Sequence, residues 1–317
     1  MCSRTSALVA TILTLTVSIA APSSAQDLTS RWGKDDQAGA SNLMTPKKVM
    51  EALKYMKTGN VIALGRTYES KMPMFGSRVF GLRGTGGYAG GPVGDNKVVW
   101  MDDFLATEIG QVGTQFDGLG HIGFGDTGAF YNGVTKDQLF GPTGLNKLGI
   151  EQLKPFFTKG ILIDLVLLKG APMDRGQEIS VADIEAALQK QGLTADAIGE
   201  GDVVLFNTGW SRHWATDNAT FGSGEPGIGV PAAQWLAKKG VAVVGADTWG
   251  VEVVPNPDSK LAFPVHQELL TKNGIFIHEN VATERLADAK VYEFAYIFAP
   301  LLIKGATGSP GNPIAVH

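Results

Sequence analysis

The chain has 317 residues, with 27 basic and 31 acidic side chains and a formal net charge of −4. The sequence contains no basic run or patch, which argues against nucleic acid as a partner. It also shows no Pro/Ser-rich linker, charge block or internal repeat, so one large globular domain is the favoured organisation.

The first 25 residues have the features of a secretory signal peptide. Arg4 precedes an apolar run over residues 7–21, and the small residues Ser23-Ser24-Ala25 follow it. We therefore predict cleavage after Ala25, a periplasmic or secreted protein, and a single mature domain over residues 26–317. A membrane anchor is the weaker interpretation, because the apolar run is short and rich in Thr and Ser. No membrane contact is expected after processing.

Processing would remove Arg4 and the only cysteine, Cys2, leaving 26 basic against 31 acidic residues and a net charge of about −5. No thiol would then remain to act as a nucleophile or to bind zinc. Any metal ion would have to be bound by His, Asp, Glu and amide oxygens.

The N-terminal part of the mature chain predicts one helix and two strands around a long glycine-rich segment. Thr45 and Pro46 have the N-cap and first-turn pattern of a helix that ends at Gly59, and a strand is predicted over residues 61–66. The glycine-rich residues 72–97 favour a lid or binding loop, with an irregular surface excursion as the alternative. A second strand is expected over residues 98–101.

The C-terminal part alternates strands and helices. Buried strands are predicted over 160–168, 203–207, 241–246, 274–279 and 291–303. Helices are predicted over 180–192, 231–239 and 264–272, each with a capping residue, proline or glycine at an end. The pattern alone supports a mixed α/β protein.

The segment from Gln111 to His121 has the highest density of polar side chains and glycines. In an extended conformation Gln111, Gln115 and Asp117 share one face, and the following glycines let His121 turn back toward Asp117. A carboxylate, an imidazole and amide oxygens around one point suit a divalent cation. The alternative is a strand and a Gly-rich turn, with Asp117 as a turn residue and His121 only hydrogen-bonded.

This segment resembles the signature of the cyclase family, which includes bacterial kynurenine formamidases and isatin hydrolases. The family pattern is His-x-Gly-Thr-His-x-Asp-x-Pro-x-His, with the looser form His-x-Gly-Thr-x-x-Asp-x-x-x-His in isatin hydrolases. The positions that match both forms are Gly113, Thr114, Asp117 and His121. The resemblance implies the swivelling β/β/α fold, an α/β architecture with a mixed sheet and flanking helices, built as a homodimer.

The chain departs from the family pattern at three positions. Gln111 and Gln115 replace two histidines that are metal ligands in the two-metal formamidases, and Leu119 replaces the proline. The resemblance then implies a single divalent ion bound by Gln111, Gln115, Asp117 and His121, with Mn²⁺ favoured over Zn²⁺. An inactive relative is the alternative.

Two further residues resemble the rest of the family's active site and are predicted to be catalytic. His266 lies in the first turn of a predicted helix, whose N-terminus favours a neutral imidazole. Glu279 follows at the end of a strand, in a Glu-Asn-Val run similar to the family's Glu-Asn-Leu. Without the resemblance, His266 would be a surface helix residue and Glu279 a salt-bridged strand end. His278 alternates with Glu279 and is expected to face away from the site.

Aromatic side chains near the signature predict a flat or cyclic substrate. Phe130 and Tyr131 lie on a glycine-rich segment, and Trp249 follows a buried strand, so these residues are expected to form a substrate wall. They could equally be core anchors.

These observations together predict a metal-dependent hydrolase acting on a small molecule. A metal-activated water would attack an amide, imide or lactone carbonyl, and His266 or Glu279 would transfer a proton to the leaving atom. Two alternatives remain: a metal-free binding or scaffold protein of the same fold, and a metal-dependent lyase or dehydratase.

Overall fold

The computed structural model describes residues 28–84 and 89–317, together with Met1. The predicted signal peptide therefore falls, except for Met1, outside the described residues. Within the described part of the chain, no helix combines the length and apolar character needed to cross a membrane.

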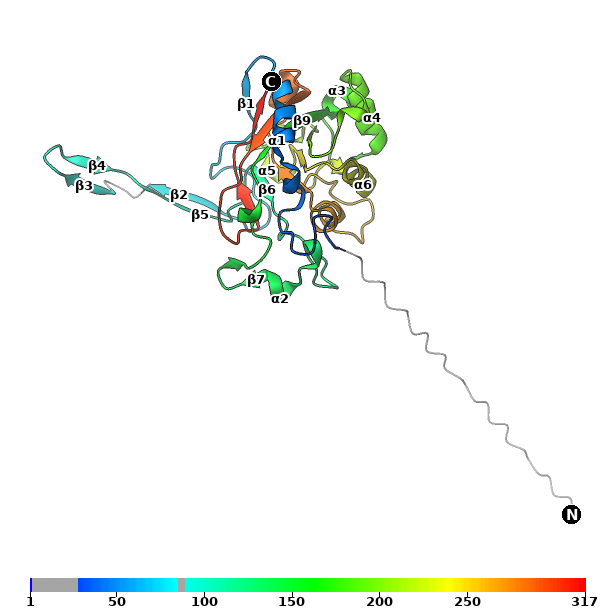
Figure 1. Ribbon diagram of the computed structural model, residues 1–317, viewed down its shortest axis with the longest axis horizontal. Helices are drawn as coiled ribbons and strands as arrows, with labels where there is room; N and C mark the ends of the chain where they lie inside the picture. The colour runs from blue at the N-terminus through cyan, green and yellow to red at the C-terminus, as the bar shows by residue number, and fades with distance from the viewer. Residues whose placement is uncertain (2–27, 85–88) are drawn as a thin grey trace.

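A nine-stranded mixed sheet forms the centre of the molecule (Figure 1). β9, β11, β13 and β14 run parallel to one another, and the remaining pairs are antiparallel. In spatial order the strands are β1 (Val61–Ala63), β17 (Ile314–Val316), β15 (Glu293–Phe298), β9 (Phe156–Asp164), β11 (Val203–Asn207), β13 (Val243–Ala246), β14 (Phe276–Glu279), β6 (Gln115–Asp117) and β16 (Gly308–Pro310).

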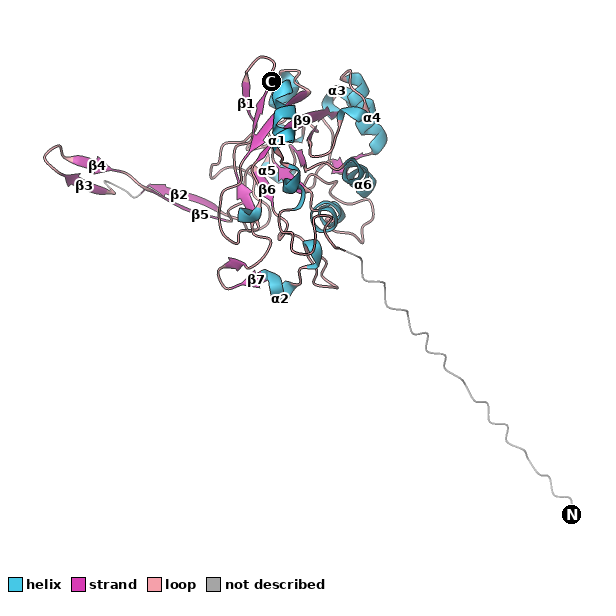
Figure 2. Cartoon of the chain, in the orientation of Figure 1, coloured by secondary structure: helices cyan, strands magenta, loops and turns pink. Residues whose placement is uncertain are grey.

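Helices flank this sheet, and short strand pairs lie outside it (Figure 2). The helices are α1 (Pro46–Ala52), α2 (Lys136–Leu139), α3 (Leu165–Lys169), α4 (Val181–Lys190), α5 (Asn218–Phe221), α6 (Val230–Lys239), α7 (Pro264–His266) and α8 (Glu284–Asp288), with a π-helix over Gln267–Lys272. The outer strands are β2 (Phe80–Gly84), β3 (Gly90–Val93), β4 (Val98–Trp100), β5 (Asp103–Thr107), β7 (Phe140–Gly141), β8 (Gly144–Leu145), β10 (Glu178–Ile179) and β12 (Gly227–Ile228).

The central strands are buried on both faces because alternate side chains enter two different cores. In β9, Ile161 and Ile163 pack with residues of α4, α6 and the π-helix, whereas Leu162 packs on the opposite face with Phe116 and Phe276. Strands that are buried on both faces have continuous apolar runs in the sequence, which is why these strands could be predicted. The expected α/β class with a mixed sheet and flanking helices is confirmed.

The predicted strand over 160–168 is wrong in its second half. β9 ends at Asp164, whose carboxylate accepts a hydrogen bond from the Leu167 backbone N–H (3.1 Å) and so caps α3. Gly170 then ends this helix in the left-handed region (φ 76°). An apolar run alone cannot separate a buried strand from a buried helical turn.

An N-terminal cluster centred on Asp36 attaches the first described residues to the body. Its carboxylate accepts hydrogen bonds from the Tyr131 hydroxyl (2.7 Å), the Asn42 amide (2.7 Å), the Ser30 hydroxyl (2.9 Å) and the Ala38 backbone N–H (3.1 Å). Burial acts to raise the pKa of Asp36, but these donors outweigh it and hold the pKa below its ordinary value.

We expect Asp36→Ala to lower the free energy of unfolding by about 2 kcal/mol at pH 7, because several donors to an ionised acceptor are lost together. Since the folded-state pKa is lowered, the advantage of the native chain over the variant is present above the ordinary carboxyl pKa of about 4 and shrinks as the pH falls below it. Urea unfolding at pH 7 and pH 3 measures both effects. Asp35→Ala, at the exposed neighbouring position, is the control; an equal loss in the two variants would contradict the assignment.

Residues 79–84 and 89–109, which we call the arm, extend away from the body (Figure 1). β2 pairs with β5, and farther out β3 pairs with β4, both antiparallel. The predicted glycine-rich lid over 72–97 therefore divides: residues 70–76 and Arg78 line a cavity on the body, and the chain beyond them enters the arm.

Candidate functional site

The pairing of β6 with β14 brings the central polar residues onto one face of the sheet. Glu279 pairs with Gln115 and His278 with Phe116, so alternate side chains separate Gln115, Asp117 and Glu279 from Phe116 and His278. His278 is buried on the other face, with its Nδ1 2.6 Å from the Tyr296 hydroxyl. The expectation that His278 faces away from Glu279 is confirmed.

The Gly-Thr pair of the signature fits a crowded position beside the strand. Gly113 has φ 65°, and a Cβ there would lie 2.6 Å from the Tyr68 ring, so only glycine is accommodated. The Thr114 hydroxyl donates to the Asn280 carbonyl (2.9 Å) and accepts from the Arg66 backbone N–H (2.8 Å). These bonds fix the start of β6 against the residue that follows Glu279.

His266 is oriented by a buried carboxylate that the sequence did not reveal. Glu252 accepts hydrogen bonds from the backbone N–H groups of Val265 (3.2 Å) and His266 (3.0 Å) and from His266 Nδ1 (2.6 Å). With Nδ1 engaged, Nε2 faces Glu279 Oε1 at 3.2 Å and Asp117 Oδ2 at 3.6 Å. Glu252 therefore directs Nε2 of the His266 ring toward Asp117 and Glu279.

Asp117, His266 and Glu279 form a buried cluster whose ligand atoms all lie within 4.8 Å of one another. Asp117 Oδ2 is buried and has no hydrogen-bond partner among the described residues. An ionised oxygen without a partner in the interior is costly, and such oxygens are normally paired or bound to a metal. The cluster therefore has the donor chemistry and the unmet acceptor expected of a divalent-cation site.

The charges around this cluster are predominantly negative. Burial raises the pKa of Glu279 to about 7, and the charge of Asp117 adds to the effect. Burial acts to lower the pKa of His266, but the carboxyl groups of Asp117, Glu252 and Glu279 outweigh it and raise the pKa well above its ordinary value. A proton on His266 is thus the local counter-charge to these carboxylates, which contradicts the neutral imidazole expected from its place at a helix N-terminus.

The two glutamines contact the carboxylates through their amide nitrogens. Gln111 Nε2 donates to Asp117 Oδ1 (3.1 Å), and its Oε1 accepts from Arg78 (3.2 Å). Gln115 Nε2 donates to Glu279 Oε2. The structure therefore places both glutamines beside the cluster as donors that orient its carboxylates, with their nitrogens toward Asp117 and Glu279.

His121 lies at the edge of the cluster. Its Nε2 is 4.0 Å from Asp117 Oδ2, and the side chain lines the adjoining cavity. Burial lowers the pKa of His121, and the Asp117 carboxylate offsets this only in part, so the imidazole is neutral near pH 7. The structure thus brings His121 close to Asp117, as predicted, but outside the tight cluster.

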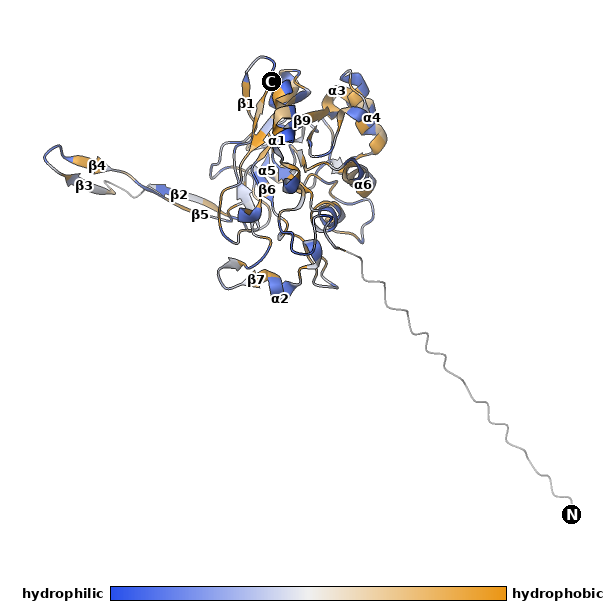
Figure 3. Cartoon of the chain, in the orientation of Figure 1, coloured by the Kyte–Doolittle hydropathy of each residue, from blue (hydrophilic) through white to orange (hydrophobic). Residues whose placement is uncertain are grey.

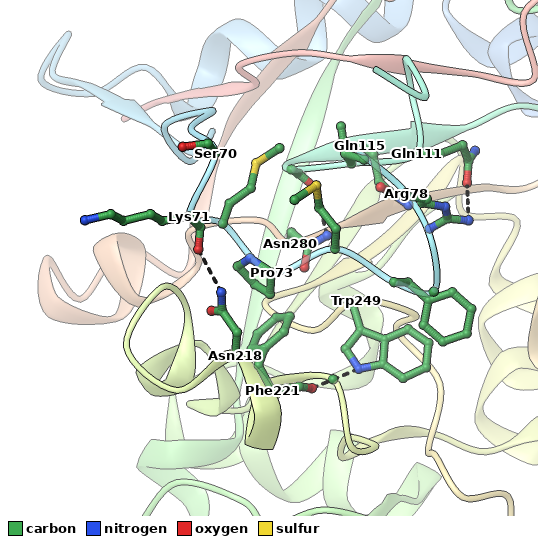
Figure 4. Close-up of a pocket in the computed structure, with 17 residues that line it drawn as sticks. Ser70, Lys71, Pro73, Arg78, Gln111, Gln115, Asn218, Phe221, Trp249 and Asn280 are labelled. Carbon is green, nitrogen blue, oxygen red and sulfur yellow. Dashed lines mark hydrogen bonds between the residues drawn. The ribbon is translucent and has the colours of Figure 1, made fainter. Parts of the chain in front are cut away.

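Two neighbouring cavities lie beside the cluster. The smaller, about 160 Å³, is lined by His121, His266 and Glu279 together with the aromatic rings of Phe75, Trp249 and Phe263. The larger, about 400 Å³, shares Phe75, Arg78, Gln111, Gln115 and Trp249 with it (Figure 4). Phe75 stacks on Trp249 with ring centroids 4.7 Å apart, so these two rings form a flat wall between the cavities.

The structure places Phe130 and Tyr131 away from these cavities, which corrects their expected position in a substrate wall. Tyr131 is fully buried, and its hydroxyl donates to Asp36 and lies 2.7 Å from the Ser30 hydroxyl. Phe130 packs against the same core and contacts Phe140 edge-on. They are core anchors, the alternative that the sequence left open, whereas Trp249 does line the cavities as expected.

A second buried acid lies behind the cavity wall. Glu225 accepts from the Trp249 backbone N–H (2.7 Å), and its Oε1 has no partner among the described residues. A Cβ at Gly250 would lie 2.9 Å from this oxygen. Burial and the charge of Glu279 raise the pKa of Glu225 well above its ordinary value.

Sequence reasoning missed Glu225, Glu252 and Phe263, and it included Phe75 and Arg78 only as part of the predicted lid or binding loop over 72–97. Each lies in a segment without regular periodicity or a recognisable motif, and each reaches the site only through long-range packing. The π-helix immediately after His266 is a local feature often found at functional sites, but its sequence has an ordinary helical pattern.

The chain is similar to known proteins over most of its length. The Cyclase family model, described as "Putative cyclase", matches residues 27–253. A crystal structure of a novel cyclase is 32% identical, covers 90% of this chain and 96% of its own, and superposes with a TM-score of 0.79. No curated protein sequence matches the chain.

Isatin hydrolases are among the more distant structural neighbours. Isatin hydrolase A from Ralstonia solanacearum is 23% identical, covers 86% of this chain and 98% of its own, and has a TM-score of 0.61. An isatin hydrolase bound to the product analogue thioisatinate is 20% identical, with the same coverages and a TM-score of 0.60. At these identities the likeness shows a shared fold. The family match over most of the chain, with its Gly113-Thr114, Asp117 and His121 signature, places this protein in the cyclase family.

Proposed function

We propose that this protein is an exported, metal-dependent hydrolase that opens or cleaves an amide, imide or lactone bond of a small cyclic or aromatic substrate. The observation that carries the proposal is the buried cluster of Asp117, His266 and Glu279 beneath an aromatic cavity, in which one Asp117 oxygen accepts no hydrogen bond from the described residues. The hydrolase neighbours of the same fold support the class of reaction.

A single divalent ion fits the donor set. Asp117, His266 and Glu279 would hold it through two carboxylate oxygens and one imidazole nitrogen, and Gln111 and Gln115 would orient the carboxylates. Oxygen and imidazole donors suit Mn²⁺ and also Zn²⁺. The proposal thus moves His266 and Glu279 from the expected catalytic roles to metal binding.

The bound ion would polarise a carbonyl and lower the pKa of water toward neutrality. His121, at the rim of the cavity, is the group placed to accept a proton from the attacking water and to return it to the leaving nitrogen or oxygen. Water adds across the bond: its oxygen joins the carbonyl carbon as the bond to the leaving nitrogen or oxygen breaks, one proton ends on that leaving atom, and the other is released when the carboxyl product ionises. Arg78 faces the same space and would pair with the carboxylate that forms.

Product and metal analysis test the proposal directly. The purified mature protein is expected to contain about one equivalent of manganese or zinc by elemental analysis. With the metal present, it should convert a member of a panel of cyclic amides, imides, formamides and lactones to a product heavier by one water. A product formed by loss of water would favour a lyase or dehydratase, and failure to bind either metal on titration would leave a binding protein of the same fold.

Trp249 provides a test of the aromatic wall. We expect Trp249→Ala to raise KM about tenfold with a smaller change in kcat, because the ring supplies apolar contact to the bound substrate. Trp249→Phe keeps an aromatic face but loses the indole N–H bond to the Phe221 carbonyl (3.0 Å), so it should restore most of the affinity. Steady-state kinetics on the substrate identified from that panel measure both effects. A native KM in both variants would contradict the assignment.

A further inference from the structure

Glu225 is an ionisable side chain in the interior of the body. Figure 3 shows hydrophobic colouring on the central strands of the body, and Glu225 is fully buried near them. The buried acids Asp117, Glu252 and Glu279 each have a role in the proposed metal site. Among the described residues, no hydrogen bond joins the Glu225 carboxyl group to that site. A buried acid is unfavourable unless its contacts compensate for the lost hydration, so these contacts indicate its role.

The segment that contains Glu225 holds both the backbone and the ring of Trp249. The Glu225 carboxyl group accepts a hydrogen bond from the Trp249 backbone N–H (2.7 Å), and the Phe221 carbonyl accepts one from the indole N–H (3.0 Å). Figure 4 shows the indole bond beside the larger cavity. Phe221 and Glu225 are only four positions apart in the chain. One short segment therefore sets the position of the aromatic wall from outside the cavities.

The turn after Trp249 has a strained backbone. Val251 has φ 62°, a left-handed conformation that is unfavourable for a β-branched residue. Such conformations persist only where the surrounding structure over-determines them. Here the Ile228 backbone N–H donates to the Val251 carbonyl (3.1 Å), and Glu225 and Val254 exchange two backbone hydrogen bonds (2.8 and 3.0 Å). The residues around Glu225 thus hold the turn in this conformation.

Gly250 packs directly against the Glu225 carboxyl group. A Cβ at Gly250 would lie 2.9 Å from Glu225 Oε1, closer than real Cβ contacts. The other carboxyl oxygen accepts the Trp249 N–H, so the side chain cannot move aside without losing that bond. Gly250 also lines the smaller cavity together with Trp249. A displacement of Glu225 is therefore transmitted to the wall of this cavity.

We propose that Glu225 is the positioning residue of the aromatic wall and that it acts on the substrate through Trp249. The role requires an acceptor oxygen at this place, because the contact is a hydrogen bond from a backbone N–H. Glu225 itself is not among the residues that line either cavity. The inference rests on the proposed function for its kinetic test, whereas the position of the turn can be measured without a substrate.

A double-mutant cycle in the metal-loaded protein tests whether Glu225 acts through Trp249. Glu225→Leu removes the acceptor at a similar side-chain size, and we expect it to raise KM about tenfold with kcat within about threefold of native. The double variant Glu225→Leu, Trp249→Ala should then be no worse than Trp249→Ala alone. Glu225→Gln keeps an acceptor oxygen and should restore KM to within about threefold of native. A native KM in Glu225→Leu, or single effects that multiply in the double variant, would overturn the proposal.

Hydrogen exchange tests the position of the turn independently of the reaction. In the metal-loaded protein without substrate, the backbone amides over residues 247–252 should exchange at least about tenfold faster in Glu225→Leu than in the native chain, and at the native rate in Glu225→Gln. Asp202→Leu is the matched control. Asp202 is also a buried acid that accepts a backbone N–H, from Gly199 (2.8 Å), and it lines neither of the two cavities. This variant should change neither the exchange of residues 247–252 nor KM.

Gly250→Ala is a second probe, which serves if Glu225→Leu does not fold. Its added Cβ displaces the turn from Glu225 without removing a hydrogen-bonding group, so the same rises in KM and in the exchange of residues 247–252 are expected. If no substrate of the panel is converted, the proposed function fails, and the exchange rates alone decide the positioning role. Native exchange rates in whichever of the two variants folds would overturn that role.

Discussion

Asp117→Ala is expected to abolish stoichiometric binding of manganese or zinc and to lower turnover by on the order of 10³-fold or more. The side chain is fully buried, and its Oδ2 is the one oxygen of the cluster without a hydrogen-bond partner among the described residues. Gln111 and Gln115 cannot replace it in this arrangement, because both present amide nitrogens to the cluster.

Thermal unfolding gives a readout of this loss that is independent of activity. An ion that binds only the folded chain raises the free energy of unfolding by RT ln(1 + [M]/Kd), which is about 2.7 kcal/mol when the free ion concentration is one hundred times Kd. The native protein should therefore melt at a higher temperature with Mn²⁺ than with EDTA, and Asp117→Ala should show no such difference. Asp126→Ala, at an exposed position in the same segment, should behave as native. If Asp117→Ala kept the Mn²⁺-dependent shift, the cluster would not be the metal site.

Glu252→Gln should weaken metal binding by about 10- to 100-fold while leaving the three proposed ligands in place. The two oxygens of Glu252 accept three hydrogen bonds, from the backbone N–H groups of Val265 and His266 and from His266 Nδ1. A glutamine has only one acceptor oxygen, so its amide N–H₂ must face at least one of these donors. The His266 ring then loses the contact that directs Nε2 toward Asp117 and Glu279.

Calorimetric titration with Mn²⁺ measures the affinity, and urea unfolding in EDTA measures the accompanying loss of stability, expected to be about 1–3 kcal/mol. Glu268→Gln is a matched control: Glu268 is also buried, lies on the adjoining π-helix and pairs with Lys272 (2.7 Å) on a different surface. It should lower stability without changing the Mn²⁺ affinity. Equal affinities for native protein and Glu252→Gln would show that Glu252 has no orienting role.

Local interactions in the sequence determined the elements whose boundaries were predicted well. Ser180 and Asp183 form the reciprocal capping box that begins α4, and Gly240 in the left-handed region ends α6. The apolar run Val203–Asn207 is β11 with the same bounds. These features involve residues a few positions apart, so the sequence contains all the information that they require.

The alternation of side chains along a strand is also a local property. It determined which site residues of β6 and β14 share a face. Gln115 and Asp117 share a face, and His278 is directed away from Glu279, because successive side chains of a strand point to opposite sides. Tertiary structure decided what these side chains contact. The antiparallel pairing of β6 with β14 set Asp117 beside Glu279, and α7 brought His266 to both.

The remaining features depended on contacts between segments far apart in the chain. Glu252 lies in a loop and orients His266 by a hydrogen bond to its Nδ1. Arg78, just before the arm, donates a hydrogen bond to Gln111, just after it. Tyr131 is buried in the core, where Ser30 and Asp36 contact its hydroxyl. Such contacts form only when the whole chain packs, since no periodicity or local hydrogen bond encodes them. The sequence by itself determined the strands, helix ends and candidate ligand types, and only the tertiary structure decided which of those ligands share one buried point.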